Sequence, residues 1–168
     1  MKNIYLVGFM GTGKTAVGKV LANRLKKKFV EMDQLIEQGE KKEIKDIFAQ
    51  NGQDYFRRLE NKLLERLSSQ SDLVVSCGGG VVCNQENLYI LQNTGYVFSL
   101  YASADSIFKR TKGSDQRPLL NVADPLGKIK ALLEARKPFY QKAGTKIDTD
   151  NLCVQDVADH ILKLLENG

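Results

Sequence analysis

The sequence predicts an α/β fold in which a mainly parallel sheet carries helices on both faces. Short apolar runs that are typical of buried strands alternate with longer stretches whose apolar residues have helical spacing. Glycine or acidic residues follow the first three of these strands, at the edge of a parallel sheet where ligands bind. The length of 168 residues suits one compact domain spanning 1–168.

The first part of the chain supplies two strands and three helical stretches. Residues 3–7 form a short apolar run that ends at a glycine, which predicts a buried strand. Helical spacing begins at Lys14, with apolar residues on one face and lysines at the end of the run. A second strand is predicted over 29–32. Apolar spacing then predicts a short helix around 44–48 and a longer one over 56–67.

The middle of the chain continues the alternation. The run 73–76 predicts a third strand, which three glycines stop. Leu88 and Leu91 mark a helix, the run 96–100 predicts a fourth strand, and 104–110 is helical again. A helical stretch therefore separates each strand from the next, which is the connection that parallel strands require.

The periodicity lapses over residues 111–125. This segment is polar, contains two prolines and one glycine, and has neither helical nor strand spacing. A segment of that kind inside a compact domain is usually functional or mobile. Helical spacing returns over 129–140, a fifth strand is predicted over 145–148, and a final helix is expected over 157–165.

Composition narrows the classes of function. The net charge is +5 with scattered basic residues, so a small anionic substrate is a better explanation than nucleic acid. Three cysteines without a CxxC pair argue against a disulfide framework, and a single histidine argues against a histidine zinc site. No apolar run approaches the ~18 residues of a membrane span. We therefore expect a cytoplasmic protein without a membrane or nucleic-acid partner, and a monomer because the sequence has no coiled-coil pattern.

The loop after the first strand carries the strongest motif. Residues 8–15, GFMGTGKT, match GxxxxGK[ST] between a predicted strand and a predicted helix. In such a loop the backbone N–H groups surround phosphate oxygens, the lysine reaches the β and γ phosphates, and the hydroxyl binds Mg²⁺. The residues expected to hold the nucleotide here are Gly11, Thr12, Gly13, Lys14, Thr15 and Ala16.

A phosphate-binding loop does not by itself separate a nucleotide-dependent switch from a phosphotransferase. The segment 145–148, TKID, matches the guanine-reading [NT]KxD pattern, but the residues before it are polar and no DxxG follows a central strand. A strand that places Ile147 in the core explains this segment better. A switch is therefore the weaker alternative.

Three charged positions favour a transferase. Asp33 follows the second strand, where a carboxylate can hold an acceptor hydroxyl and take its proton; an N-cap of the following helix is the other interpretation. Arg57 and Arg58 suit a two-pronged grip on a carboxylate, or a solvated helix face. Both pairs of alternatives stay open on the sequence.

Three further groups are candidates. The glycines 78–80 allow close backbone approach to a ligand, although a plain loop is the other interpretation. Arg117 lies in the irregular segment, where an arginine on a lid can cover a γ-phosphate, and is otherwise a loop residue in solvent. Arg136 lies in a helical run and is either a ligand of the substrate or a surface charge.

Taken together, these residues resemble the shikimate kinase family over nearly the whole chain. The motifs that carry the resemblance are the phosphate-binding loop, Asp33, Phe56-Arg57-Arg58, Gly78-Gly79-Gly80, Arg117-Pro118-Leu119-Leu120, and Arg136 with Pro138 and Tyr140. The resemblance implies a P-loop kinase fold: a three-layer αβα sandwich with a five-stranded parallel sheet and a mobile lid, at about 111–125. It also implies ATP-dependent phosphorylation of the 3-hydroxyl of shikimate, with Mg²⁺ as the cofactor.

The resemblance also implies a role for each site residue. Asp33, Lys14 and Arg117 would be catalytic, and Arg110 would stack on adenine. The residues implied for shikimate are Asp33, Arg57, Gly78, Gly79, Gly80 and Arg136, with Phe48 and Phe56 as the apolar wall. Thr15 would bind Mg²⁺, and Arg117 would also contact the nucleotide.

The chain departs from the family pattern in two places. Glu31 stands where the family usually carries an aspartate that assists Mg²⁺, so its metal role is an open expectation. Residues 151–154, NLCV, replace an adenine loop that often holds arginine and proline. Glu60 is implied either to pair with an arginine or to lie exposed. Besides the switch, a related kinase for gluconate or a nucleoside monophosphate is an alternative.

Overall fold

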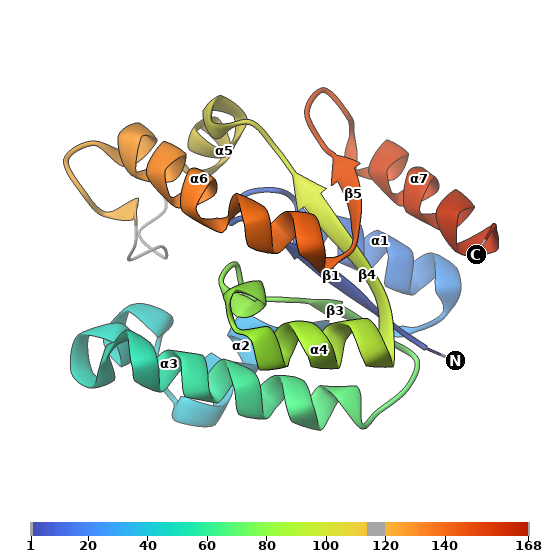
Figure 1. Ribbon diagram of the computed structural model, residues 1–168, viewed down its shortest axis with the longest axis horizontal. Helices are drawn as coiled ribbons and strands as arrows, with labels where there is room; N and C mark the ends of the chain where they lie inside the picture. Colours follow the sequence, from blue (N-terminus) through green and yellow to red (C-terminus); the bar gives the residue numbers. More distant parts are fainter. Residues whose placement is uncertain (1, 114–119, 168) are drawn as a thin grey trace.

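The computed structural model describes residues 2–113 and 120–167. Five parallel strands form one sheet in the order β2-β3-β1-β4-β5 (Figure 1). The strands are β1 (Asn3–Gly8), β2 (Lys28–Glu31), β3 (Leu73–Ser76), β4 (Gly95–Tyr101) and β5 (Thr145–Asp148). The helices are α1 (Lys14–Leu25), α2 (Met32–Glu40), α3 (Ile44–Ser68), α4 (Gln85–Thr94), α5 (Ala104–Thr111), α6 (Pro125–Ala143) and α7 (Val154–Glu166), with a short 3₁₀ turn, η1 (Val81–Cys83).

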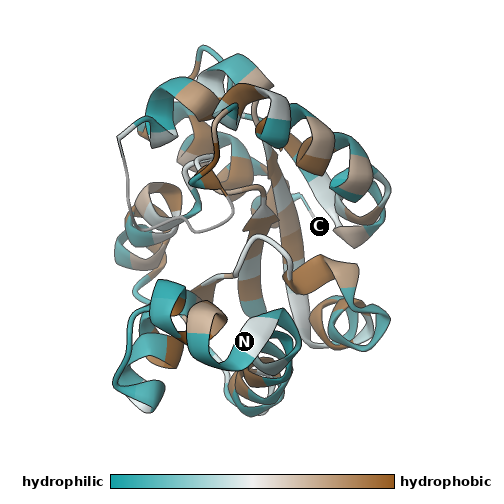
Figure 2. Cartoon of the chain, turned by 90° about the vertical axis from the view of Figure 1, so that its left-hand side faces the viewer, coloured by the Kyte–Doolittle hydropathy of each residue, from teal (hydrophilic) through white to brown (hydrophobic). Residues whose placement is uncertain are grey.

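The sheet is buried between two layers of helices, as the sequence predicts. Alternate residues of β1 point to opposite faces, so Tyr5 and Val7 join one core cluster and Ile4 and Leu6 join the other. The first cluster packs under α3, α4 and α6, and the second under α1 and α7 (Figure 1). The strands are the most hydrophobic part of the molecule, and the helices carry hydrophilic residues on their outer sides (Figure 2).

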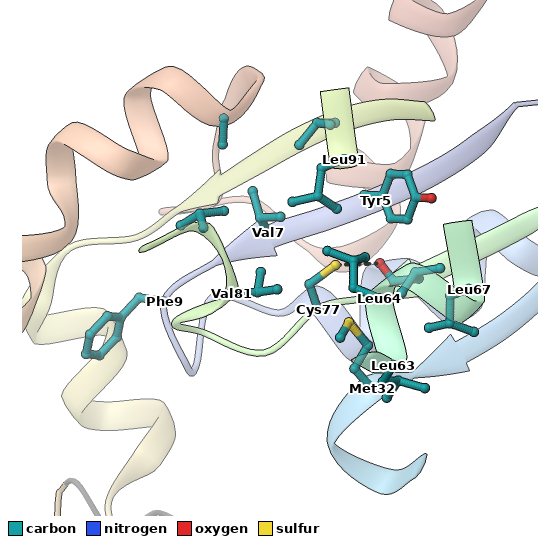
Figure 3. Close-up of a cluster of buried hydrophobic side chains, with 14 of the residues drawn as sticks. Tyr5, Val7, Phe9, Met32, Leu63, Leu64, Leu67, Cys77, Val81 and Leu91 are labelled. Atoms are coloured by element: carbon teal, nitrogen blue, oxygen red, sulfur yellow. Dashed lines mark hydrogen bonds between the residues drawn. The ribbon is translucent and has the colours of Figure 1, made fainter. Parts of the chain in front are cut away.

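The larger cluster reaches from the sheet to the phosphate-binding loop. Leu63, Leu64 and Leu67 of α3 pack around Cys77 and Met32, while Phe9 lies beyond the end of β1, apart from the others (Figure 3). Burial of each such side chain contributes roughly 1.5–3 kcal/mol before the conformational entropy of folding is subtracted. The buried core therefore extends into the phosphate-binding loop.

The junction between β2 and α2 differs from the sequence prediction. The second strand covers Lys28–Glu31, one residue earlier than predicted, because Met32 already begins α2. Helix α2 follows that strand directly, and the apolar spacing did not mark it as a separate element. Asp33 consequently lies inside the first turn, and the N-cap position belongs to Glu31, so the N-cap interpretation of Asp33 is wrong.

The two helices predicted around 44–48 and over 56–67 are the two parts of α3, which is interrupted at Gly52. Gly52 has φ 81° and ψ 172° inside α3, a conformation that glycine adopts readily and other residues do not. The break separates the segment that carries Phe48 from the segment that carries Phe56 and Arg57. Ile147 is fully buried in β5, as its strand interpretation predicts.

Among the described residues, none of the helices combines the length and the hydrophobicity that crossing a bilayer would need. The expected lid at 111–125 falls mostly on residues that the structure does not describe or that belong to the ends of α5 and α6. The lid therefore stays a prediction.

Candidate active site

The phosphate-binding loop joins β1 to α1 with the backbone that its glycines permit. Gly11 and Gly13 have φ values of 78° and 92°, in the left-handed region that residues with a Cβ rarely adopt. Gly13 occupies the N-cap position of α1, so the positive end of the helix dipole faces the loop. This arrangement is a ready-made anion site.

Lys14 is held inside the loop. Its Nζ donates to the carbonyl oxygens of Gly8 at 2.9 Å and of Phe9 at 3.0 Å, and the side chain is buried. Thr12 also donates to Phe9 O, at 2.8 Å. The ammonium group therefore stands at the centre of the loop, where phosphate oxygens can replace the carbonyls as its acceptors.

A cavity of about 300 Å³ opens above the loop at the carboxyl ends of the strands. Its lining brings together most residues expected at the nucleotide: Met10, Gly11, Gly13, Lys14, Thr15, Ala16, Glu31, Asp33, Ser76, Cys77, Gly79 and Arg110. Thr12 is buried beneath the loop rather than in this lining. The phosphate-binding loop and the carboxylates of Glu31 and Asp33 thus share one space.

Two side-chain oxygen atoms meet in the lining of this cavity. Thr15 Oγ1 donates to Glu31 Oε2 at 2.5 Å, so the longer carboxylate reaches the hydroxyl directly. Burial raises the pKa of Glu31, against the opposing effects of the Thr15 and Ser76 hydroxyls. Ser76 is opposite Glu31 in the sheet register and is fully buried; sequence reasoning missed it, although a serine ending an apolar strand before glycines is a recognisable signal.

Asp33 lines the cavity and also lies close to the glycine loop. Its position in the first turn of α2 is one where the helix dipole favours a negative charge. A Cβ added at Gly78 would lie 3.3 Å from Asp33 Oδ1 and would overlap Glu60 Oε1. The first glycine of the triplet therefore leaves room for two carboxylates.

Glu60 is the buried partner of Arg57. The side chain of Glu60 is 1% exposed, and its Oε2 accepts a hydrogen bond from Arg57 Nη1 in an ion pair. Burial raises the pKa of Glu60, while Arg57 and Arg136 act to lower it. Of the two interpretations left open by the sequence, the ion pair is the correct one. The sequence signal for a buried Glu60 was its spacing, because Glu60 lies on the same helix face as Leu63 and Leu64.

Gly80, the third glycine of the triplet, makes room for Arg57. A Cβ at Gly80 would overlap the Arg57 guanidinium, which is half-buried against this loop. Arg57 also packs over the Phe56 ring, 5.6 Å from its centroid, and the Phe48 and Phe56 rings are 4.9 Å apart. The predicted arginine and the predicted apolar wall are therefore neighbours.

Arg136 reaches the same loop from α6. It is buried, and its Nη1 would lie 3.7 Å from a Cβ at Gly79. The guanidinium stacks over Phe9, 5.6 Å from the ring centroid. Burial rules out the surface-charge interpretation. Arg58, in contrast, is exposed and packs over Tyr55.

Arg110 lines the same cavity, next to the phosphate-binding loop. It donates to Gly11 O at 3.1 Å and to Thr149 Oγ1 and O at 3.4 Å, which links the phosphate loop to the segment after β5. Thr149 leads into residues 151–154, where an adenine contact is expected. Arg117 lies outside the described residues.

The fit around the triple glycine gives a stability prediction. Gly78→Ala is expected to lower the free energy of unfolding by about 1–3 kcal/mol, because the new methyl group displaces the buried Glu60 carboxylate. Gly39→Ala is the matched control: nothing lies within 4 Å of a Cβ there, and removing a helical glycine stabilises by about 0.5–1 kcal/mol. Urea denaturation measures both. Equal stabilities for the two variants would contradict the packing argument.

Comparison with known proteins agrees with this geometry. The family model described as shikimate kinase matches residues 10–166. A shikimate kinase of Sulfurihydrogenibium sp. (strain YO3AOP1) is 46% identical over 162 residues, which cover 96% of this chain and 96% of that protein.

Solved structures extend the comparison to the fold. The structure of shikimate kinase from Acinetobacter baumannii in complex with shikimate has a TM-score of 0.97 at 37% identity, and covers 99% of this chain and 94% of that chain. A gluconokinase from Sinorhizobium meliloti 1021 has a TM-score of 0.65 at 18% identity, with coverage of 99% and 94%. The second likeness shows a shared fold and no more.

Proposed function

The chain belongs to the shikimate kinase family, and from that premise we propose how its own residues phosphorylate the 3-hydroxyl of shikimate with ATP. The observation that carries the proposal is the shared cavity, in which the phosphate-binding loop, Asp33 and Gly79 lie together. Donor and acceptor groups side by side in one space are what direct phosphoryl transfer requires.

The donor side is formed by the loop and its lysine. In this proposal the backbone N–H groups of residues 11–16 bind the phosphates, and Lys14 exchanges its two carbonyl partners for phosphate oxygens. Arg110 holds the adenine end, supported by its position between the loop and Thr149. Arg117 is assigned to the transferring phosphoryl group by the family resemblance alone.

The acceptor side is formed by two arginines, the glycine loop and an aromatic wall. Arg57 and Arg136 bind the carboxylate, which guanidinium groups recognise with two parallel hydrogen bonds. Phe48 and Phe56 cover the apolar side of the ring, and the Gly78–Gly80 backbone contacts the ligand. Asp33 binds the reacting hydroxyl and accepts its proton as the hydroxyl oxygen bonds to the γ-phosphorus of ATP and the bond from that phosphorus to the β-phosphate oxygen breaks, so that ADP leaves.

The residues present suit Mg²⁺. Thr15 Oγ1 and Glu31 Oε2 converge at 2.5 Å beside Asp33, and hard oxygen ligands of this kind, completed by phosphates and water, are what Mg²⁺ prefers. The ion supplies charge neutralisation of the β and γ phosphates when bound. Thr15 and Glu31 would hold it. Removing Mg²⁺ with EDTA should stop ADP release, and activity that persists would contradict this assignment.

The acceptor-dependent release of ADP tests the proposal. With ATP, Mg²⁺ and shikimate the protein should release ADP, and release should fall to background without shikimate, because the cavity holds the acceptor next to the phosphate loop. Gluconate and nucleoside monophosphates serve as the acceptors that test the alternative kinases. GTP in place of ATP tests the switch, which should bind GTP tightly and hydrolyse it slowly without an acceptor. An ADP release rate that does not depend on shikimate would overturn the assignment.

We also propose a cytoplasmic monomer. The three cysteines are all free thiols, one of them buried, which suits a reducing compartment. Analytical ultracentrifugation should give the mass of one chain, 18.8 kDa. A stable dimer at assay concentrations would contradict the monomer.

A further inference from the structure

Tyr140 joins helix α6 to the glycine loop. It follows Arg136 by one turn, and residues four apart share a helix face, so both side chains point inward. Tyr140 is 2% exposed, and its hydroxyl donates a hydrogen bond to Gly79 O. Tyr140, which is 61 residues away in the sequence, thus contacts the backbone of the glycine loop directly.

Gly79 is also the point where the glycine loop meets the phosphate-binding loop. A Cβ there would lie 3.5 Å from Met10 N and 3.7 Å from Arg136 Nη1. The Arg136 guanidinium stacks in turn over Phe9, at the start of the phosphate-binding loop. Tyr140 therefore belongs to a contact network that reaches both sides of the cavity.

The hydrogen bond from Tyr140 to Gly79 O fixes the orientation of a whole peptide group. The C=O and N–H of a trans peptide are coplanar and point in opposite directions, so holding Gly79 O also sets the direction of the Gly80 N–H. Burial raises the pKa of Tyr140, against the opposing charge of Arg136, so the hydroxyl stays protonated and able to donate. Pro138 lies between Arg136 and Tyr140 and removes one N–H donor from the helix ladder. Anchoring Tyr140 to the loop supports the helix at this point.

We propose that Tyr140 is a positioning residue for the acceptor: its hydroxyl holds the Gly79–Gly80 peptide and the neighbouring Arg136 in the arrangement that receives the substrate carboxylate. The inference rests on the proposed function, in which Arg136 and the backbone at Gly79 hold shikimate. Tyr140 acts through these groups and does not line the cavity itself.

Tyr140→Phe tests the proposal by removing only the hydroxyl. The KM and Kd for shikimate should rise about tenfold, while kcat and the KM for ATP should stay within about twofold, because the donor loop keeps its own contacts. Tyr5→Phe is the matched control. Tyr5 is fully buried, and its hydroxyl is 2.9 Å from Thr94 Oγ1, away from the cavity. Its removal should lower the melting temperature without changing the shikimate KM.

Two further arms separate a positioning role from a structural one. The methyl ester of shikimate lacks the negative charge, so Tyr140→Phe should weaken binding of shikimate more than binding of the ester; equal losses would overturn the inference.

Arg136→Ala should weaken shikimate binding by itself. If Arg136→Ala binds shikimate weakly while Tyr140→Phe binds it normally, only the role of Tyr140 is wrong. If Arg136→Ala has no effect, the carboxylate assignment fails and the inference with it.

Discussion

Lys14→Ala is expected to reduce kcat by about 10³-fold, which in practice abolishes turnover. Loss of one preorganised electrostatic contact to developing charge typically costs 10²–10³ in kcat, and Lys14 contributes a full charge in a buried loop. The same change removes the donor that Gly8 O and Phe9 O share, so the melting temperature should also fall. Steady-state kinetics with saturating shikimate measure the first effect, and thermal denaturation the second.

Lys163→Ala provides the control for loss of a positive charge. Lys163 is exposed on α7, on the face of the sheet covered by α1 and α7. This variant should keep wild-type kcat and stability. If Lys14→Ala retained more than about a tenth of wild-type kcat, the proposed role of Lys14 in phosphoryl transfer would be wrong.

The phosphate-binding loop could be predicted from the sequence because its conformation is local. Eight consecutive residues set that conformation, and the structure confirms their position at the junction of β1 and α1. The sheet was predictable for a related reason. Buried parallel strands are continuous apolar runs, and 73–76 and 145–148 matched β3 and β5 to the residue.

The acceptor side depends on contacts between distant elements, which single-sequence reasoning does not give. The triple glycine was expected to allow approach of a ligand. The structure adds a steric reason: Gly78 and Gly80 leave room for Glu60 and Arg57, which come from another helix. Nothing in the glycines themselves indicates those partners. The hydrogen bond from Tyr140 to Gly79 O was hidden for the same reason.

The start of α2 shows how a small boundary error changes a chemical interpretation. The sequence left Asp33 open between N-cap and catalytic group, since both follow a strand. Because Met32 begins the helix, Asp33 lies inside the first turn, and its side chain packs toward Gly78. The backbone-capping role is thereby removed, and the carboxylate lines the cavity with Lys14 and Thr15.

Asp33→Asn is consequently expected to lower kcat by about 10²–10⁴-fold, the range typical for loss of a positioned proton acceptor. Asparagine has nearly the same shape, so the contacts with Gly78 and the first turn of α2 are preserved and folding should be unchanged. The amide still hydrogen-bonds a hydroxyl, so the KM for shikimate should change far less than kcat. Steady-state kinetics varying shikimate at saturating ATP separate the two parameters.

Asp54→Asn is the matched control, because Asp54 is an exposed carboxylate on α3 and its loss should leave both parameters unchanged. The pattern of the Asp33→Asn result distinguishes two roles for the carboxylate. A fall in kcat alone means that the charge acts in the transition state, as a proton acceptor should. A rise in KM with unchanged kcat would mean that Asp33 only binds the hydroxyls, and the proton would then leave by way of the phosphate oxygens or water.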